Sequence, residues 1–483
     1  MMEHLSALGP LLLIWLLICI GIIIYLSAKV KLHPFLSIIV ATYLFALGSN
    51  LLGKLVGVKK ALIPDIGGTI TGGFGDIIAS IGMVIIFGTI IGKIIEKSGA
   101  AITMAESILR FIKNPGLAMS IIGWVVSIPV FCDSGYVILS SLKKSIAKKT
   151  NVNIIVLSVS LATGLYASHT FVPPTPGPIA AAGNLGIGAS DLIWVILVGA
   201  VVSIFAALAG YFYAAKFTRN MESDLDSATE TFEEYKSKFN RIPSAFQAFT
   251  PIFLPVVLMA LGSIASFPVS GVGTDHVKTL ITGPLFTVIN FIGQPVNALF
   301  IGLLAAIFLL LPKKNEETLT KWVAEGLLDS AIIIMITGAG AAFGSVIKAT
   351  PIADYIKSLL DGNTLFVGAG ALFLLFIISA LLKTAQGSST AALIITSTIV
   401  MPLLPALGLD TVIGNIPIGQ VLAVMAIGSG AMVVSHVNDS YFWVVTQFSG
   451  MKLTTAYKAQ TVATLIQGIV GILVTFILGL IFL

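Results

Sequence analysis

The sequence predicts an all-α polytopic membrane protein, and three observations support this fold class. Of the 483 residues, 57% are hydrophobic and only 10% are charged, whereas a water-soluble protein needs roughly 25% charged residues to cover its surface. The mean hydropathy is +1.03. The apolar residues also gather in runs long enough to cross a bilayer core of about 30 Å, which takes about 20 helical residues. Membrane lipid is therefore the first predicted partner.

Apolar runs of this length predict about ten spanning helices. The runs are Leu11–Leu26, Phe35–Leu52, Ile77–Ile95, Ile154–Ala182, Leu192–Ala214, Phe249–Phe267, Leu280–Leu311, Leu327–Ile347, Val421–Val444 and Thr461–Leu483. The first run has no basic segment before it and no small-residue cleavage site after it, so we expect a retained helix.

Two further apolar stretches are interrupted by polar residues. The first, about residues 117–141, is interrupted at Pro129 and again at Asp133–Gly135. The second, about residues 365–404, is interrupted between Lys383 and Thr390. Each stretch is long enough for two half-helices, so we predict two re-entrant hairpins. Non-helical backbone at membrane depth is tolerated only where protein or a wet cavity surrounds it.

The two halves of the chain repeat the same order of elements. Two helices, about residues 154–184 and 421–446, are predicted to be broken, and their histidines, His169 and His436, lie 267 positions apart. Asp76 and Asp329, 253 positions apart, are each expected to open a helix. Five spans per half, an odd number, would insert the second half upside down. We therefore predict two inverted-topology repeats, a pattern typical of secondary transporters.

The repeats are predicted to cover residues 1–215 and 249–483, with a charged linker at 216–248. Between Lys216 and Ser244 the linker holds eleven of the 49 charged residues. Lysines cluster on one predicted side of the membrane, at positions 29, 31, 143 to 149, 313 and 314, and the positive-inside rule makes that side cytoplasmic. The linker is then cytoplasmic and both termini are extracytoplasmic, although Lys54, Lys59 and Lys60 fall on the other side. The lysines are scattered singly or in pairs, so the net charge of +5 indicates orientation and no nucleic-acid partner.

Four segments place polar residues within the apolar runs, at the two hairpins and the two broken helices. Each break frees backbone N–H and C=O groups, and the N-termini of half-helices present partial positive charge that suits a carboxylate. The candidate substrate-binding residues are Asp133, Ser134, Gly135, Ser168, His169, Thr170, Lys383, Gln386, Gly387, Ser388, Ser389, Thr390, Ser435, His436, Asn438 and Asp439.

The ionisable members of this set are the strongest functional candidates. A charge at membrane depth costs several kcal/mol, so Asp133, Lys383 and Asp439 are expected to serve function. The structural alternative is that each acid only caps a half-helix and that the lysine reaches an interface. His169 and His436 can titrate near neutral pH, so they join the two acids as proton-coupling candidates; the alternative is a hydrogen-bonded core histidine.

Several other kinds of site lack support in the sequence. Cys19 and Cys132 give neither a disulfide framework nor a metal cluster. No Walker-type lysine loop is present, so ATP-driven transport is not indicated. The glycine-rich run Gly67–Gly75 is expected to be an entry loop. No two of the five histidines are spaced as metal ligands on one helix. We therefore predict no cofactor and no metal.

Three segments make the chain similar to a known family. They are Ser168-His-Thr-Phe-Val-Pro-Pro-Thr-Pro-Gly-Pro178, Ala385-Gln-Gly-Ser388, and Ser435-His-Val-Asn-Asp439 followed by Phe442-Trp443. They resemble the signature segments of the gluconate permease (GntP) family of the ion transporter superfamily, and the resemblance covers essentially the whole chain. It implies proton-coupled symport of gluconate or a related small hydroxy-carboxylate, such as a sugar acid, glycerate or D-serine, across a prokaryotic inner membrane. By superfamily analogy it also implies a homodimer with a scaffold and an elevator-like transport domain.

One segment departs from the family pattern. Gluconate-type members carry a Glu in a Phe-Glu-Val-Gly context, where this chain has Phe131-Cys-Asp-Ser-Gly135. The shorter acid and added hydroxyl argue against gluconate itself and leave the class of small hydroxy-carboxylates.

Other functions remain as alternatives. The first is a sodium-coupled dicarboxylate or citrate-type carrier, because backbone carbonyls with Asn438, Ser388 and Ser389 would suit sodium. A membrane-embedded enzyme is a distant one. A channel is disfavoured, because hairpins of opposite polarity suit alternating access better.

Overall fold

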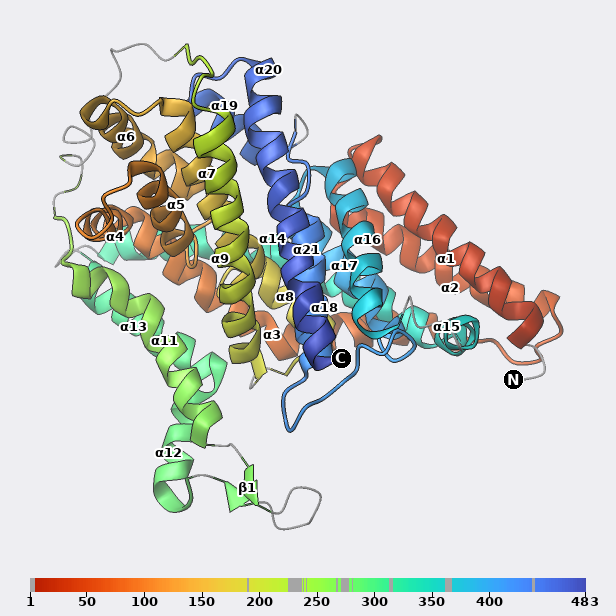
Figure 1. Cartoon of the computed structure of the whole chain (residues 1–483). Helices are drawn as coiled ribbons and strands as arrows, with labels where there is room; N and C mark the ends of the chain where they lie inside the picture. Colours follow the sequence, from red (N-terminus) through yellow and green to blue (C-terminus); the bar gives the residue numbers. More distant parts are fainter. Residues whose placement is uncertain are drawn as a thin grey trace.

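Helices dominate the computed structural model (Figure 1). It describes residues 5–188, 191–224, 237, 239, 241–265, 268–270, 278–279, 281–311, 316–360, 367–436 and 439–483. Within these residues, eight helices are long and apolar enough to cross a membrane, or up to nine if one bent pair forms a single span. The prediction of an all-α polytopic membrane protein is confirmed, with fewer candidate spans among the described residues than the ten or so predicted.

In the first half, proline-containing segments separate the short helices. The helices are α1 (Leu5–Ala28), α2 (Pro34–Leu55), α3 (Ile66–Lys97), α4 (Ala100–Leu109), α5 (Pro115–Val126), α6 (Cys132–Thr150), α7 (Ile154–Phe171), α8 (Pro176–Asn184) and α9 (Leu192–Phe217). Pro129 lies between α5 and α6, and Pro173 and Pro174 lie between α7 and α8. Proline lacks an N–H and disfavours helix in the preceding residue, so these breaks are encoded locally.

The second half also contains short helices. Its elements are α11 (Ala245–Ala265), β1 (Pro268–Ser270), β2 (Lys278–Thr279), α12 (Gly283–Gly293), α13 (Pro295–Leu310), α14 (Glu316–Lys348), α15 (Ile352–Leu360), η4 (Gly368–Gly370), α16 (Ala371–Gln386), α17 (Ser389–Val400), η5 (Met401–Leu403), α18 (Ile418–Ala431), α19 (Ser440–Phe448), α20 (Leu453–Ala456), η6 (Tyr457–Thr461) and α21 (Val462–Phe482). Strands β1 and β2 form a small antiparallel ribbon. Helix α16 ends at Gln386, and its C-cap Gly387 has a φ of +78°, a conformation that glycine adopts without strain.

One predicted helix is in fact two. The apolar run Leu280–Leu311 was expected to be continuous, but α12 and α13 are bent by 69° at Gln294. The cause is Pro295, which starts α13: a proline fits the first turn of a helix and disfavours helix in the residue before it.

The glycine-rich run Gly67–Gly75 is also helical and is not the expected entry loop. Helix α3 starts at its N-cap Asp65, whose Oδ1 accepts from the backbone N–H of Gly68 at 2.8 Å. Asp76 and Asp329 therefore lie inside α3 and α14 and do not open helices. Tertiary packing overrides the low helix propensity of glycine here.

Helices α3 and α14 pack antiparallel. A Cβ on Gly73 would lie 2.2 Å from Ser345 Oγ, and one on Gly326 would lie 2.9 Å from the Cα of Ile90. The start of α3 therefore lies beside the end of α14, and the later part of α3 lies beside the first part of α14. Ion pairs join the two helices at Lys93–Asp329 (2.9 Å) and at Lys97–Glu325 (3.1 Å). In inverted repeats, corresponding helices cross the membrane in opposite directions, and the antiparallel packing of α3 and α14 agrees with this. The repeat and its boundaries stay predictions.

The remaining helices flank this pair. Helices α1 and α2 lie at one side of the molecule, and α11, α12 and α13 lie at the other (Figure 1). Between them α5 packs against α7, and α16 packs against α18. Glycines permit both contacts: a Cβ on Gly164 would lie 2.0 Å from the Ser120 carbonyl oxygen, and one on Gly430 would lie 2.3 Å from that of Phe376. Lys313, Lys314 and linker residues 225–236, 238 and 240 lie outside the described residues.

Candidate functional site

A buried ion pair lies where α16 meets the start of α19. Lys383 Nζ is 2.6 Å from Asp439 Oδ2 and donates to the Gly387 carbonyl at 2.8 Å. The Lys383 side chain is 0% exposed and that of Asp439 5%. Asp439 is also the N-cap of α19: Oδ1 accepts from the Tyr441 N–H at 3.0 Å, and Oδ2 accepts from Ser435 Oγ at 2.5 Å. Both buried charges are thus paired and hydrogen-bonded, as burial of ions requires.

The turn between α16 and α17 is shorter than the sequence indicated. Helix α16 continues through Gln386, so the turn consists of Gly387 and Ser388. Ser388 Oγ caps α17 by accepting from the Ala391 N–H at 3.2 Å. Ser389 and Thr390 occupy the first turn of α17. The predicted residues of this segment therefore share one helix–turn–helix junction.

Gln386 stands out at this junction. Its amide nitrogen and oxygen are both buried, and neither has a hydrogen-bond partner in the described part of the chain. A buried polar group left unpaired costs about 1–3 kcal/mol. Gln386 is thus the side chain there that gains most from a polar ligand.

The first hairpin presents its acid differently from the expectation. Asp133, Ser134 and Gly135 lie in the first turn of α6 and are not part of the turn itself. The Ser440 hydroxyl donates to Asp133 Oδ1 at 3.4 Å, which joins the start of α6 to the start of α19. Asp133 and Ser134 line a cavity of about 420 Å³, whose other lining residues are Glu96, Lys97, Val137, Ile138 and Phe239. Gly135 is a packing position, because a Cβ there would lie 2.7 Å from Leu165 Cδ2.

The hydroxyls near the end of α7 are occupied by backbone carbonyls. Ser168 Oγ donates to the carbonyl of Trp124 in α5, and Thr170 Oγ1 donates to that of Tyr166 at 3.0 Å. These two contacts stabilise the first half. In the described structure, the hydroxyls of Ser168 and Thr170 therefore donate to backbone carbonyls and not to the Lys383–Asp439 pair.

The two predicted histidines have different surroundings. His169 is buried, its ring centroid lies 5.7 Å from that of Phe131, and its Nδ1 has no partner among the described residues. His436 Nε2 lies 3.0 Å from the Thr384 carbonyl oxygen, beside the second hairpin. Asn438 lies outside the described residues.

Two tyrosines that the sequence did not single out connect these segments. The rings of Tyr166 and Tyr441 stack with centroids 5.2 Å apart. The hydroxyl of Tyr166 is hydrogen-bonded to Ser389 Oγ at 2.6 Å, and Lys383 Nζ lies 6.0 Å from its ring centroid. The available signal was position: each tyrosine lies within three residues of a predicted site residue, His169 or Asp439.

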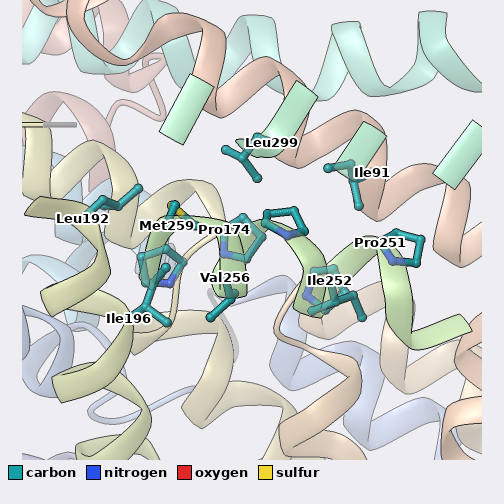
Figure 2. A pocket seen from close by; sticks show the side chains of 12 residues that line it. Ile91, Pro174, Leu192, Ile196, Pro251, Ile252, Val256, Met259 and Leu299 are labelled. Carbon is teal, nitrogen blue, oxygen red and sulfur yellow. The ribbon is translucent and has the colours of Figure 1, made fainter. Parts of the chain in front are cut away.

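A second pocket is lined by the prolines of the helix breaks (Figure 2). Pro129, Pro173 and Pro174 face Pro251 and Ile252 of α11 there. All of its lining residues are apolar, which suits helix packing and offers nothing to a charged ligand. In the described parts of the chain, no group of three or more His, Cys, Asp or Glu residues could hold a metal ion.

Comparison with known proteins identifies the family. The GntP family permease model matches residues 11–481. The D-serine transporter DsdX of Escherichia coli K12 is 31% identical over 470 residues, which cover 96% of this chain and 98% of the relative. The gluconate permease of Pseudomonas aeruginosa is 28% identical over 479 residues, covering 98% of each chain.

A solved structure shares the fold. The structure of Neisseria gonorrhoeae MtrF, said to represent a class of antimetabolite efflux pumps, is 17% identical, covers 95% of this chain and 97% of that chain, and has a TM-score of 0.66. At this identity the match shows the fold alone. The chain belongs to the GntP permease family and is a multi-pass membrane transporter, not an enzyme.

Proposed function

We propose that the chain is a secondary active transporter that carries a small hydroxy-carboxylate together with a proton across a prokaryotic inner membrane. Candidate substrates are a sugar acid, glycerate or D-serine. The family and the relatives named for gluconate and D-serine support this substrate class. The observation that carries the proposal is the buried Lys383–Asp439 pair.

Charge balance at this pair links the anion to the proton. A substrate carboxylate competes with Asp439 for the Lys383 ammonium, which has one buried acid partner in the described structure. Two carboxylates facing one buried ammonium would leave one negative charge uncompensated, at a cost of several kcal/mol. If Asp439 takes up a proton as the substrate carboxylate reaches Lys383, the charge of the site is unchanged. One anion and one proton then enter together.

Neutral donors at the same junction suit the rest of a hydroxy acid. The unpaired amide of Gln386 and the first turn of α17, with Ser389 and Thr390, can hydrogen-bond a carboxylate or hydroxyl. Asp133, which faces the cavity, can accept from a substrate hydroxyl or ammonium group. Substituting Thr390 by a bulky residue is expected to weaken substrate binding without unfolding the protein.

The proposal includes a homodimer and an elevator-like movement. The contacts of α5 with α7 and of α16 with α18 support the movement, because each hairpin is packed against its neighbouring broken helix through a glycine, Gly164 or Gly430. Each hairpin and its broken helix would then move as one unit.

Purified protein in vesicles tests the coupling. A panel of aldonates, uronates, glycerate, D-serine and dicarboxylates is first screened for thermal stabilisation of the protein. With the best ligand, Asp439→Asn should retain exchange between the two faces and lose accumulation driven by a pH gradient. Asp133→Asn and His436→Ala are the controls; if only one of them loses accumulation, the proton is carried there. Uptake that ignores a protonophore and requires external sodium would favour the sodium-coupled dicarboxylate or citrate-type carrier.

A further inference from the structure

We propose that Lys143 is a positioning residue whose ammonium holds the C-terminal end of α19 against α6. Through this contact it sets the spacing of Asp133 and Asp439 at the N-terminal ends of the same two helices. The inference rests on the proposed function only in that it takes these two acids to serve the substrate.

Lys143 lies inside the protein, and none of its contacts among the described residues is an acid. Its side chain is 0% exposed, and Nζ lies 3.0 Å from the Tyr136 hydroxyl, 3.0 Å from the Phe448 carbonyl oxygen and 3.2 Å from Ser449 Oγ. Nζ also lies 4.6 Å from the Tyr136 ring centroid. A lysine whose described contacts are all neutral oxygens is costly to bury, so its buried position indicates a specific role.

Lys143 Nζ lies at the C-terminal end of helix α19. Phe448 is the last residue of α19, and carbonyls in the last turn of a helix have no intrahelical partner. The same end carries the negative pole of the helix dipole, which favours a cation. At the other end Asp439 is the N-cap, where the dipole favours an anion. Helix α19, nine residues and about 13 Å long, is therefore held by a lysine at its C-terminal end and by an aspartate at its N-terminal end.

Helix α19 is joined to α6 at both of its ends. At its N-terminal end Ser440 donates to Asp133 at 3.4 Å. At its C-terminal end Tyr136 and Lys143 of α6 both reach Ser449, the first at 2.6 Å from hydroxyl to hydroxyl. Contacts at both ends of α19 restrict its sliding along α6. Loss of the second contact would free α19 to shift, and with it the carboxylate of its N-cap.

The turn after α19 is also held from outside. Ser223 Oγ donates to the Ser449 carbonyl at 2.6 Å, and the Asp224 N–H donates to the Gly450 carbonyl at 2.8 Å. The linker thus fixes the far side of the turn. Lys143 is the contact through which α6 is aligned with this fixed point.

The first test needs no substrate. Cys132, at the start of α6, is 2% exposed, and the other cysteine is removed by Cys19→Ser. In that background we expect Lys143→Met to speed the alkylation of Cys132 by N-ethylmaleimide at least about tenfold. The matched control is Lys144→Met, which removes the same charge from the next position of α6 and should leave the alkylation rate unchanged.

The second test separates positioning from simple loss of folded protein. In vesicles, Lys143→Met should raise KM for the transported acid about tenfold and leave the maximal rate per folded molecule within about twofold. Ser449→Ala keeps Lys143 in place. It should raise the rate of Cys132 alkylation and KM, but each by less than Lys143→Met does. If Lys143→Met does not fold, the pair Tyr136→Phe and Ser449→Ala gives the same two readouts.

The outcomes distinguish the two proposals. Equal Cys132 alkylation in the Lys143 and Lys144 variants overturns the positioning role. A drop in maximal rate with KM unchanged also overturns it, because that is the result of a merely structural residue. A wild-type protein that transports none of the acids contradicts the proposed function, while the alkylation experiment still decides the role of Lys143.

Discussion

The break between α7 and α8 and the break between α18 and α19 differ in the side chains that lie beside them. Between α7 and α8 the break holds Pro173 and Pro174, an apolar pocket lies beside it, and the nearby His169 leaves Nδ1 unpaired among the described residues. Between α18 and α19 the break leads to Asp439, which is paired with Lys383. A polar group at membrane depth is expensive in either place. The comparison indicates that, of these two breaks, only the second carries a buried ion pair in the described part of the chain.

The largest expected effect comes from breaking the ion pair. Lys383→Met leaves Asp439 buried without its cation, so we expect a loss of about 3–5 kcal/mol in the free energy of unfolding and no transport. The double variant Lys383→Met with Asp439→Asn should regain most of the stability and none of the transport. Thermal unfolding in detergent and uptake into vesicles measure the two effects.

The corresponding change at the first break is His169→Phe. It should alter the free energy of unfolding by less than about 1 kcal/mol, since it removes an unpaired buried nitrogen and keeps a ring against Phe131. Equal losses of stability at the two breaks would contradict the difference drawn between them.

A smaller effect tests what the two halves share. Gly164→Ala and Gly430→Ala each force a Cβ against a backbone carbonyl oxygen, at 2.0 Å from Ser120 and 2.3 Å from Phe376. We expect each to lower the free energy of unfolding by about 1–3 kcal/mol, as overpacking does. Thermal unfolding of both variants is the measurement. A pronounced effect in one half and none in the other would mean that the hairpin contacts are not equivalent.

The smallest effect concerns the unpaired amide. Gln386→Leu should leave the stability of the empty protein unchanged or slightly higher and weaken substrate binding about tenfold, the value of roughly one hydrogen bond. Thermal stabilisation by the substrate measures the affinity. Gln420→Leu is the matched control, because Gln420 in α18 also has a buried amide oxygen without a partner in the described structure. A weakening of equal size in both variants would remove Gln386 from the site.

The helices were predictable because backbone in a bilayer must satisfy its own hydrogen bonds, which long apolar runs report directly. The bend at Gln294 was not predicted, because the hydrophobicity of a run does not show whether its helix is straight. Pro295 was the one signal of the bend in that run. The short helices α4 and α15 were not predicted either, because neither is an uninterrupted apolar run of spanning length.

The site could be predicted residue by residue but not as a set of contacts. Lys383 and Asp439 were each recognised from the cost of a charge in a membrane, yet no spacing rule joins residues that are 56 positions apart. The stacking of Tyr166 on Tyr441 depends on the same tertiary contact. Lys143 counted only as a signal of orientation, because burial of a lysine cannot be read from its neighbours in the sequence.

The pairing of Lys383 with Asp439 has a consequence for the energy source of transport. A membrane potential acts on net charge with about 2.3 kcal/mol per elementary charge per 100 mV, and two opposite charges 2.6 Å apart cross the field together as a dipole. Zwitterionic D-serine with one proton would add one positive charge to that sum. For a sugar acid or glycerate, one monovalent anion and one proton leave the sum unchanged, so voltage neither drives nor opposes the step. The pH difference alone sets the limit of accumulation, at about tenfold for each pH unit.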